Sequence, residues 1–454
     1  MVFRAAARFK KSLFTGMQAG SALLQSMLWR GLYYVAAFII NILIARHFEA
    51  SVSGTIYYIS SLYALVLLFS SLSLESGIIY FTAREEIPAA KLFNFSIVWS
   101  LLIGLLTFFT VYWFFNELYR GIPADLVLLS AVMFISGNLL TTYCSGFFYA
   151  HNNYIVPNSI IIISTLILIA LIPYGGSSVI PAINDDNYFY VYFSSFFVQG
   201  TCMAIAAKIK YIKEGFLRFV SIPEFKLLFR YCGLAFLGNI IFFLLYRIDY
   251  FFVEKYCSAE QLGNYIQVSK LVHLFFILPT ILAGAVFPIT AGGKIEHINV
   301  GLTLLSRCIF SLYSLICLVL ALTGKWLFPF VFGESFTDMY LPFLWLIPGI
   351  LSLSGIFTLT AWFAGKNRIR INITGSVLAL IVILAGDMLF IPTHGIMAAA
   401  MVSSAGYIVY QVYIIAVFKK EYPCAVADFF IFRSSDWQQV KSRILVSLKT
   451  KNES

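Results

Sequence analysis

Charged residues are scarce in this sequence, and their scarcity decides the class of protein. Only 11% of the 454 residues are Asp, Glu, Lys or Arg, whereas a soluble domain carries about a quarter. The mean hydropathy is +0.87, and the apolar runs reach about 20 residues, the length of a membrane-spanning helix. The alternating strands of an outer-membrane barrel would be about ten residues long. The sequence therefore predicts an all-α integral membrane protein.

The signatures of several enzyme classes are also missing. No GxxxxGK(S/T) phosphate loop occurs, so the chain is not expected to hydrolyse ATP itself. No HExxH motif occurs, the five histidines are scattered, and the seven cysteines form no CxxC pair, which argues against a metal or disulfide framework. A glycan polymerase would be expected to carry a large outer loop, and the predicted loops are short. We therefore predict a protein that is not an enzyme and has no cofactor.

The apolar runs predict about twelve spans when they are averaged over a window of about 19 residues. The central, most basic loop at 210–227 separates six spans at 21–209 from six at 228–418, with a basic segment at 1–20 and a tail at 419–454. The predicted spans are 21–46, 54–82, 92–115, 124–149, 155–174, 188–209, 228–254, 262–289, 299–323, 339–364, 371–391 and 396–418.

The basic residues predict how the chain is oriented in the membrane. Most of the 31 lysines and arginines lie in the two termini and in every second loop, which the positive-inside rule assigns to the cytoplasm. The opposite loops hold only Arg46, Arg120, Lys255 and Lys325. We expect a multi-pass protein of the plasma or inner membrane with both termini in the cytoplasm. Because topology explains the net charge of +10, no nucleic-acid partner is expected.

The two halves of the chain show a weak internal similarity. The start of the second span matches the start of the eighth when Gly54 is aligned with Gly263, which predicts two copies of the same orientation. At this offset the first and seventh spans each carry a polar stripe with helical spacing. We expect both stripes to face a shared interior. The stripes are Ser26, Arg30, Tyr33, Ala37 and Asn41, and Ala235, Asn239, Phe242, Tyr246 and Tyr250.

Several ionisable residues lie inside predicted spans, where a charge is costly unless it is paired or hydrated. Arg307 and Asp387 lie within about two turns of a span end, which favours a structural role. Arg30 lies about half-way along an apolar run, which favours a functional one. The full set is Arg30, Glu75, Arg247, Asp249, Lys270, Arg307 and Asp387.

Arg247 and Asp249 are too close in sequence to pair with one another, because residues two apart on a helix point about 200° apart. Asp249 shares the face of the stripe, and we expect Lys270 or Arg30 to be its partner. Arg247 lies off that face and is expected to hold the cavity wall or an anionic ligand. A guanidinium suits a phosphate because it stays charged and donates two parallel hydrogen bonds.

The seventh and eighth spans resemble the polysaccharide-transporter family, the lipid-linked oligosaccharide flippases of the O-antigen repeat-unit type within the multidrug/oligosaccharidyl-lipid/polysaccharide exporter superfamily. In the first half, Ser53-Gly54 and the stretch from Ser76-Gly77 to Arg84 resemble that family less exactly. The residues that carry the resemblance are Arg247-Ile248-Asp249, Leu262-Gly263-Asn264-Tyr265, Leu278-Pro279 and Phe287-Pro288.

The resemblance implies a MATE-like fold of two six-helix lobes around a central cavity. The cargo would be a polyprenyl-pyrophosphate-linked oligosaccharide, moved from the cytoplasmic to the outer leaflet for cell-surface polysaccharide biosynthesis. Membrane lipids and glycan polymerase machinery would be the partners. Many members have two further helices, but the tail after Lys420 is charged and amphipathic, so a thirteenth span is not expected here.

We predict that the substrate contacts the following residues of the cavity: Arg30, Tyr33, Asn239, Tyr246, Arg247 and Lys270. Asp249 and Glu75 are the candidates for coupling transport to a Na⁺ or H⁺ gradient. Two alternatives stay open. A cation-coupled multidrug exporter would use acids and aromatics, for which Glu75, Asp249 and Asp387 are the candidates. A membrane glycosyltransferase is disfavoured by the missing outer loop.

Overall fold

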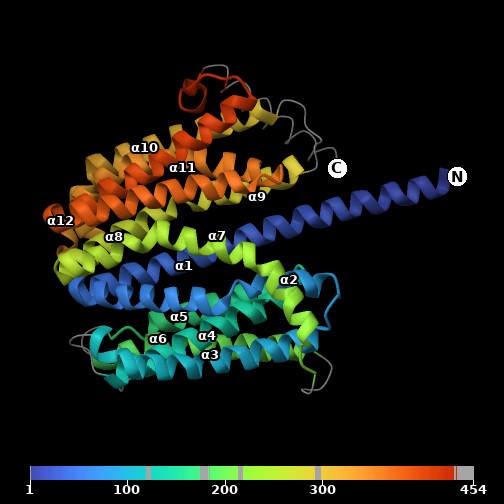
Figure 1. Ribbon diagram of the computed structural model, residues 1–454, viewed down its shortest axis with the longest axis horizontal. Coiled ribbons are helices and arrows are strands. Elements are labelled where there is room, and N and C mark those ends of the chain that lie inside the picture. The colour runs from blue at the N-terminus through green and yellow to red at the C-terminus, as the bar shows by residue number, and fades with distance from the viewer. Residues whose placement is uncertain are drawn as a thin grey trace. The chain divides into compact units, whose positions relative to one another are not determined.

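The computed structural model describes residues 2–118, 124–173, 183, 185–212, 218–291, 298–433 and 436. Figure 1 labels the helices along the chain. Their bounds are α1 (Val2–Ser71), α2 (Leu74–Ala83), α3 (Ala89–Leu118), α4 (Ala124–Ala150), α5 (Ile155–Ala170), α6 (Asp185–Tyr211), α7 (Ile222–Tyr256), α8 (Ala259–Leu274), α9 (Ile277–Ala291), α10 (Ile298–Phe332), the 3₁₀ helix η2 (Glu334–Met339), α11 (Tyr340–Gly365), α12 (Ile369–Glu421) and the 3₁₀ helix η3 (Val426–Phe429).

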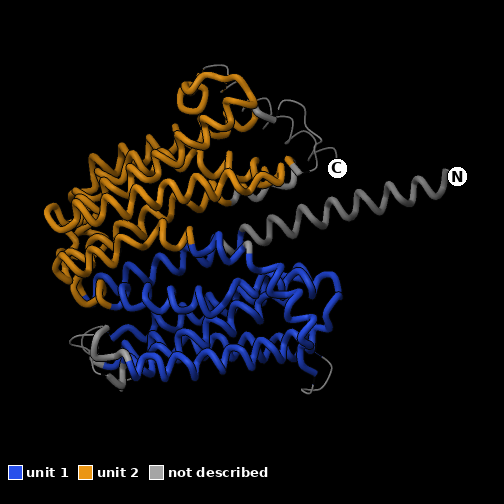
Figure 2. Tube along the Cα trace, in the orientation of Figure 1, with its two compact units in different colours: residues 1–48, 56–240 blue, residues 49–55, 241–454 orange. Residues whose placement is uncertain are grey.

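The chain divides into two compact units, which Figure 2 colours separately. Unit 1 comprises residues 1–48 and 56–240, and unit 2 comprises residues 49–55 and 241–454. The division falls inside the continuous helix α7, between Ile240 and Ile241. The lobes at 21–209 and 228–418 stay a prediction about the functional halves of the protein.

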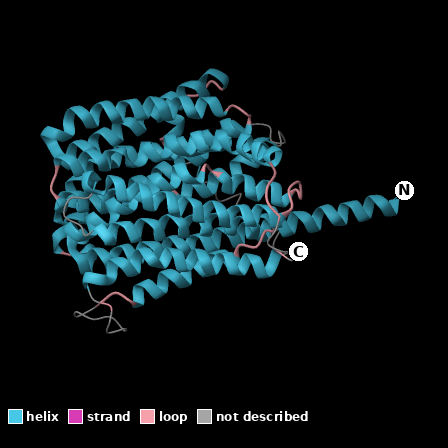
Figure 3. Cartoon of the chain, turned by 60° about the horizontal axis from the view of Figure 1, so that its bottom comes forward, coloured by secondary structure: helices cyan, strands magenta, loops and turns pink. Residues whose placement is uncertain are grey.

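All regular secondary structure in the described part of the chain is helical (Figure 3), which confirms the predicted fold class. Among the described residues, eight helical segments are long and apolar enough to cross a membrane. Ile369–Glu421 contains two of the predicted spans, and Gly31–Ser71 overlaps two others. The shorter helices α5, α8 and α9 occupy two further predicted spans, so the twelve apolar runs all have helical counterparts.

Helices α1 and α12 each reverse direction at a single residue. In α1 the backbone reverses at Glu49, with φ of 58°, and the Tyr57 hydroxyl donates to the Asn41 carbonyl oxygen across the turn at 3.1 Å. In α12 it reverses at Gly395, with φ of 57°, a conformation that glycine adopts without steric cost. Each helix is therefore a hairpin of two spans.

Two predicted spans, 54–82 and 262–289, are wrong as single helices. The second is interrupted between α8 and α9, because Pro279 has no N–H to donate to the carbonyl of Phe275 four residues earlier. That carbonyl accepts from the Tyr313 hydroxyl. The first is interrupted at Leu72 and Ser73, both with positive φ.

Side chains from neighbouring helices satisfy the carbonyls at the interruption in unit 1. Tyr143 of α4 donates to the Ser71 oxygen at 3.0 Å, and Trp99 of α3 donates to the Ser70 oxygen at 2.9 Å. An open carbonyl inside a membrane costs several kcal/mol, and these donors offset that cost at the break.

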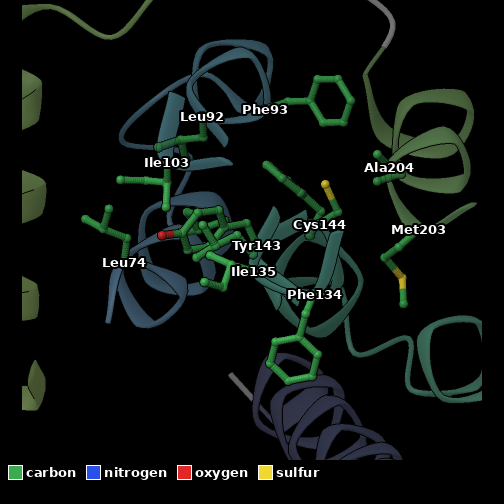
Figure 4. Packing of buried hydrophobic residues seen from close by; sticks show 14 of the residues in the cluster. Leu74, Leu92, Phe93, Ile103, Phe134, Ile135, Tyr143, Cys144, Met203 and Ala204 are labelled. Atoms are coloured by element: carbon green, nitrogen blue, oxygen red, sulfur yellow. The ribbon is translucent and has the colours of Figure 1, made fainter. Parts of the chain in front are cut away.

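Helix α4 lies at the centre of the apolar core of unit 1. Its Ile135, Tyr143 and Cys144 are fully buried, and Figure 4 shows them among side chains from α2, α3 and α6. The Tyr63 hydroxyl lies 2.8 Å from the Ser130 hydroxyl, so this buried polar group is satisfied. The core holds these helices as one body and fixes the position of α2.

Helix α11 is the centre of unit 2 and packs between α10 and the α12 hairpin. Ser306 of α10 lies 2.9 Å from Thr358 of α11, and Ser404 of α12 donates to the Trp345 carbonyl at 2.6 Å. Small hydroxyl residues of this kind let membrane helices approach closely and hydrogen-bond across the interface.

Two helices of unit 2 approach closely at the two glycines that the internal similarity aligns. A Cβ on Gly54 would lie 2.5 Å from the Gly263 Cα, and a Cβ on Gly263 would overlap the Ala50 carbonyl oxygen. Ser258 caps α8 just before this contact, with a 3.1 Å bond from the Gln261 N–H. Only glycine fits at either position.

We expect Gly263→Ala to lower the free energy of unfolding by about 1–3 kcal/mol, because the new methyl group must push two backbones apart. Gly301→Ala in α10 is the matched control, since no atom lies within 4 Å of its Cβ position and a helical alanine is favoured over glycine. Thermal unfolding of the purified variants in detergent measures both. Equal melting temperatures for the two variants would contradict the contact.

Candidate functional site

Two buried carboxylates on different helices form the most unusual polar feature of unit 2. Asp249 of α7 is 5% exposed and Asp387 of α12 is fully buried. The charge of Asp249 acts on Asp387. Two carboxylates that share a site cannot both stay ionised without a proton or a cation between them.

The two carboxylates differ in how they are held. Asp249 accepts hydrogen bonds from the hydroxyls of Tyr265 and Ser403, the second at 3.1 Å, and from the Tyr250 N–H at 2.9 Å. The Tyr250 hydroxyl lies 2.8 Å from the Ser269 hydroxyl, which completes the network. The described donors to Asp249 are thus neutral groups, and the expectation that Lys270 or Arg30 is its partner stays a prediction.

Asp387 has no such support among the described residues, where neither of its carboxylate oxygens has a hydrogen-bond partner. A fully buried carboxylate without donors is costly unless it is protonated or binds a cation. The sequence interpretation gave Asp387 a structural role because it lies near a span end. The structure shows that the end is the reversal at Gly395, which keeps Asp387 among packed helices.

The side chains around this pair carry oxygen ligands. The described residues contain no group of three or more His, Cys, Asp and Glu side chains that fits a metal ion. Two carboxylates with the hydroxyls of Tyr265 and Ser403 suit a hard cation or a proton better than a transition metal. The pair is therefore a candidate site for a coupling ion.

A cationic cluster lies further along α7 and α8 in unit 2. The charge of Arg247 acts on both Lys270 and His273, which places the three side chains near one another. The Arg247 guanidinium lies over the Phe243 ring, with Cζ 5.3 Å from its centroid. No carboxylate of the described part of unit 2 forms an ion pair with Arg247. The cluster can therefore bind an anion.

Aromatic rings connect the cationic cluster to the acidic pair. Tyr246 contacts His273, Phe276 and Tyr407, with ring centroids 5.7, 4.8 and 5.9 Å apart. The charges of Asp249 and Asp387 act on Tyr407. Tyr246 was predicted as a substrate contact, and its ring offers an apolar face next to the cations.

Unit 1 holds the other predicted site residues. Asn239 of α7 is exposed, and its side-chain amide donates to the Ser73 hydroxyl at 2.9 Å, exactly where the helix is interrupted. Glu75 lies in the first turn of α2, with one buried carboxylate oxygen that has no partner among the described residues. Tyr33 is half-buried beside Tyr34, with ring centroids 5.4 Å apart. The Arg30 side chain lies outside the described residues.

The structure thus brings together Tyr246, Arg247 and Lys270 in unit 2, and it adds His273 and Asp387 to the candidates. A sequence signal existed for His273, because it follows Lys270 by three residues and shares its helix face. The ion pair of Arg307 was not predictable. Its Nη2 bonds Asp436 of the C-terminal tail at 2.9 Å, so Arg307 is paired in the core of unit 2 and is not a site residue.

Comparison with known proteins identifies the fold. No family model and no curated protein matches the sequence. A solved structure described as the lipid II flippase MurJ, in an inward closed conformation, superposes with a TM-score of 0.70 at 14% identity and covers 89% of each chain.

MATE-family multidrug resistance transporters of the MOP superfamily are also similar. The inward-facing form gives a TM-score of 0.64 at 13% identity over 87% of this chain and 96% of that one. The outward-facing form gives 0.60 at 13% identity over 88% and 95%. The chain therefore has the fold of MOP-superfamily transporters, a fold of multi-pass membrane proteins.

The two carboxylates should respond oppositely to replacement by leucine. Asp387→Leu removes an unsupported buried carboxylate and is expected to leave the free energy of unfolding unchanged or raise it by about 1–4 kcal/mol. Asp249→Leu leaves three hydrogen-bond donors without their acceptor and is expected to lower the free energy of unfolding by about 1–3 kcal/mol or more. Denaturation of both variants in sodium-free detergent buffer at neutral pH provides the measurement. A larger loss for Asp387→Leu than for Asp249→Leu would contradict the assignment.

Proposed function

We propose that the protein is a membrane flippase for a polyprenyl-pyrophosphate-linked oligosaccharide, working by alternating access in cell-surface polysaccharide biosynthesis. The cationic cluster of Arg247 and Lys270, with the His273 imidazole beside them, carries the proposal. A pyrophosphate is an anion with several acceptor oxygens, and guanidinium and ammonium groups bind it with charge-assisted hydrogen bonds. The fold shared with a structure described as a lipid II flippase supports a lipid-linked substrate.

Residues of unit 1 also have proposed substrate contacts. Arg30 would supply a second guanidinium for the pyrophosphate, while Tyr33 and Asn239 would stack on and hydrogen-bond the sugar, as Tyr246 of unit 2 would. An O-antigen repeat unit is the cargo that the resemblance implies, and glycan polymerase machinery is the partner that would receive it. The cargo would move from the cytoplasmic to the outer leaflet.

We further propose that the carboxylate pair couples transport to a cation gradient. A proton or Na⁺ bound between Asp249 and Asp387 would offset one of their two negative charges, and its release would return the two charges to mutual repulsion. Such a difference in charge is what lets an ion bias a conformational equilibrium. Glu75 remains a proposed second coupling group in unit 1, where the N-terminus of α2 stabilises a carboxylate.

A cation-coupled exporter of small molecules is the second candidate function. Its support is the same carboxylate pair, because a buried acidic site with Tyr265 and Tyr407 around it also suits an organic cation. The fold supports this function equally, since MATE-family transporters share it. The cationic cluster favours the flippase, because a cationic drug is repelled by Arg247 and Lys270.

The test of the flippase is transport by the Arg30→Ala/Arg247→Ala variant. We expect outer-leaflet exposure of the lipid-linked glycan to fall at least tenfold in proteoliposomes or cells, since each guanidinium contributes about 1.5–3 kcal/mol to an anionic contact. Arg247→Lys should retain part of the activity because the charge remains. Lys325→Ala, at an exposed lysine of α10, is the matched control and should transport normally.

Full transport by the double variant would overturn the role of both arginines. A drug-sensitivity panel on a strain that lacks the protein separates the second function. Sensitivity to several organic cations without any glycan defect would favour the exporter over the flippase.

The test of coupling is ligand-dependent stability. We expect NaCl to raise the melting temperature relative to choline chloride at equal ionic strength if Na⁺ binds the pair, because a ligand of the folded state stabilises it. Asp387→Asn should abolish the difference, while Glu254→Gln, at an exposed acid on the same helix as Asp249, should keep it. If a proton is the coupling ion, the two salts give equal melting temperatures, and lowering the pH stabilises wild type but not Asp387→Asn. No response to either ion would refute the coupling role.

A further inference from the structure

An apolar groove on unit 1 is not used by the proposed function. It has a volume of about 240 Å³ and lies between the first turns of α3 and the segment that leads into α7. Its α3 wall belongs to the candidate span Ala89–Trp113, whereas its other wall ends well before the span that begins at Ala235. The groove therefore opens at the edge of the membrane-spanning region. Its lining residues are Phe95, Val98, Phe219, Val220, Ile222 and Phe225.

The walls of the groove are held in place by specific contacts. Phe95 packs on Phe225 with ring centroids 6.0 Å apart and stacks on Trp99 at 5.6 Å. The Asn94 side-chain amide donates to the Arg218 carbonyl at 2.9 Å, which ties the segment before α7 to α3. The groove is thus formed and held by the packing of α3 and α7.

Basic side chains border the groove. Arg218, Lys226 and Arg230 are exposed, and Ile222, Lys226 and Arg230 follow one another at four-residue spacing along one face of α7. Ile222 lines the groove and is 74% exposed, so the apolar wall continues directly into the basic stripe. The surface combines an apolar slot with positive charge beside it.

The nearby acid Glu224 does not cancel the positive charge beside the groove. Glu224 lies 2.9 Å from the Lys91 ammonium and accepts from the Ser221 N–H and hydroxyl, both at 2.7 Å. The hydrogen bond from Lys91, followed by those from Ser221, lowers the pKa of Glu224 to about 2. Its charge is therefore matched within the protein, and the net charge left facing outward is positive.

We propose that this groove and its basic stripe form a binding site for an anionic phospholipid, with an acyl chain in the groove and the phosphate against Lys226 and Arg230. Charge complementarity selects this occupant, because an apolar slot alone would accept any lipid. Basic residues at a membrane surface attract anionic lipids with about 1 kcal/mol each. The site lies on the loop side that the basic residues assign to the cytoplasm, where anionic lipids face the protein.

Trp99 provides a probe for the groove because it stacks on Phe95. We would titrate the purified full-length protein with phosphatidylglycerol or phosphatidylcholine carrying the same dibrominated chains, and subtract the quenching seen in Trp99→Phe. Phosphatidylglycerol should quench Trp99 at a lower mole fraction. Lys226→Ala/Arg230→Ala should remove this preference, with a loss of about five-fold per basic side chain.

Two matched controls separate this site from general electrostatics. Lys210→Ala/Lys420→Ala removes two exposed charges elsewhere and should keep the preference for phosphatidylglycerol. Val98→Phe should block quenching by filling the groove, whereas Leu101→Phe, on the same helix, should not. Equal quenching by the two lipids, or equal losses in the two charge variants, would overturn the proposal. Displacement of the anionic lipid by soluble glycerol phosphate would show that the site recognises a free phosphate and takes no acyl chain.

Discussion

The cost of burying charge among apolar side chains decides where the polar residues of this protein lie. Arg307 and Asp436 are both nearly inaccessible and neutralise each other across a 2.9 Å ion pair. Asp249 is equally buried but is held by hydroxyl groups, and Asp387 has no donor among the described residues. Buried charges that are paired brace the fold, whereas the acidic pair stores a repulsion that a cation or proton relieves.

The same constraint acts on the backbone. A helix that breaks inside a membrane exposes carbonyls that must find donors, and the two breaks are served by Tyr143 and Trp99 in unit 1 and by Tyr313 in unit 2. Each donor reaches across from a helix that is continuous at that depth. The breaks are therefore supported positions, and the Asn239 amide shows that polar side chains gather there.

Hydropathy was sufficient to predict the helices, because the length of an apolar run and its helical structure follow from the same bilayer thickness. Gly54 and Gly263, which the internal similarity aligns, are in contact, and the repeat itself stays a prediction. The interruption at Pro279 was readable from the missing N–H, but the one at Leu72 and Ser73 carries no proline or glycine signal and depends on donors far away in the sequence.

The candidate site was predicted only in part, for a physical reason. In the sequence, a residue's distance from a predicted span end serves as a measure of its distance from water. That measure fails where two spans meet at one residue. Asp387 is such a case: it lies near a predicted span end and yet is fully buried, because Gly395 joins packed helices. The partner of Arg307 was equally hidden, since Asp436 lies in a tail whose fold-back depends on tertiary contacts. Arg247 and Lys270 could be proposed as site residues because charge inside an apolar run is visible in any sequence.

The hairpin of α12 has a consequence for how the protein enters the membrane during synthesis. Because a single residue joins the two arms, they can enter the bilayer together as a hairpin. In that hairpin Val402 packs against Gly386, the residue before Asp387. One side of Asp387 is thus covered by the other arm of the hairpin when the segment enters the lipid. This lowers the free-energy barrier to inserting a charged segment, which a lone helix would expose to lipid on every side.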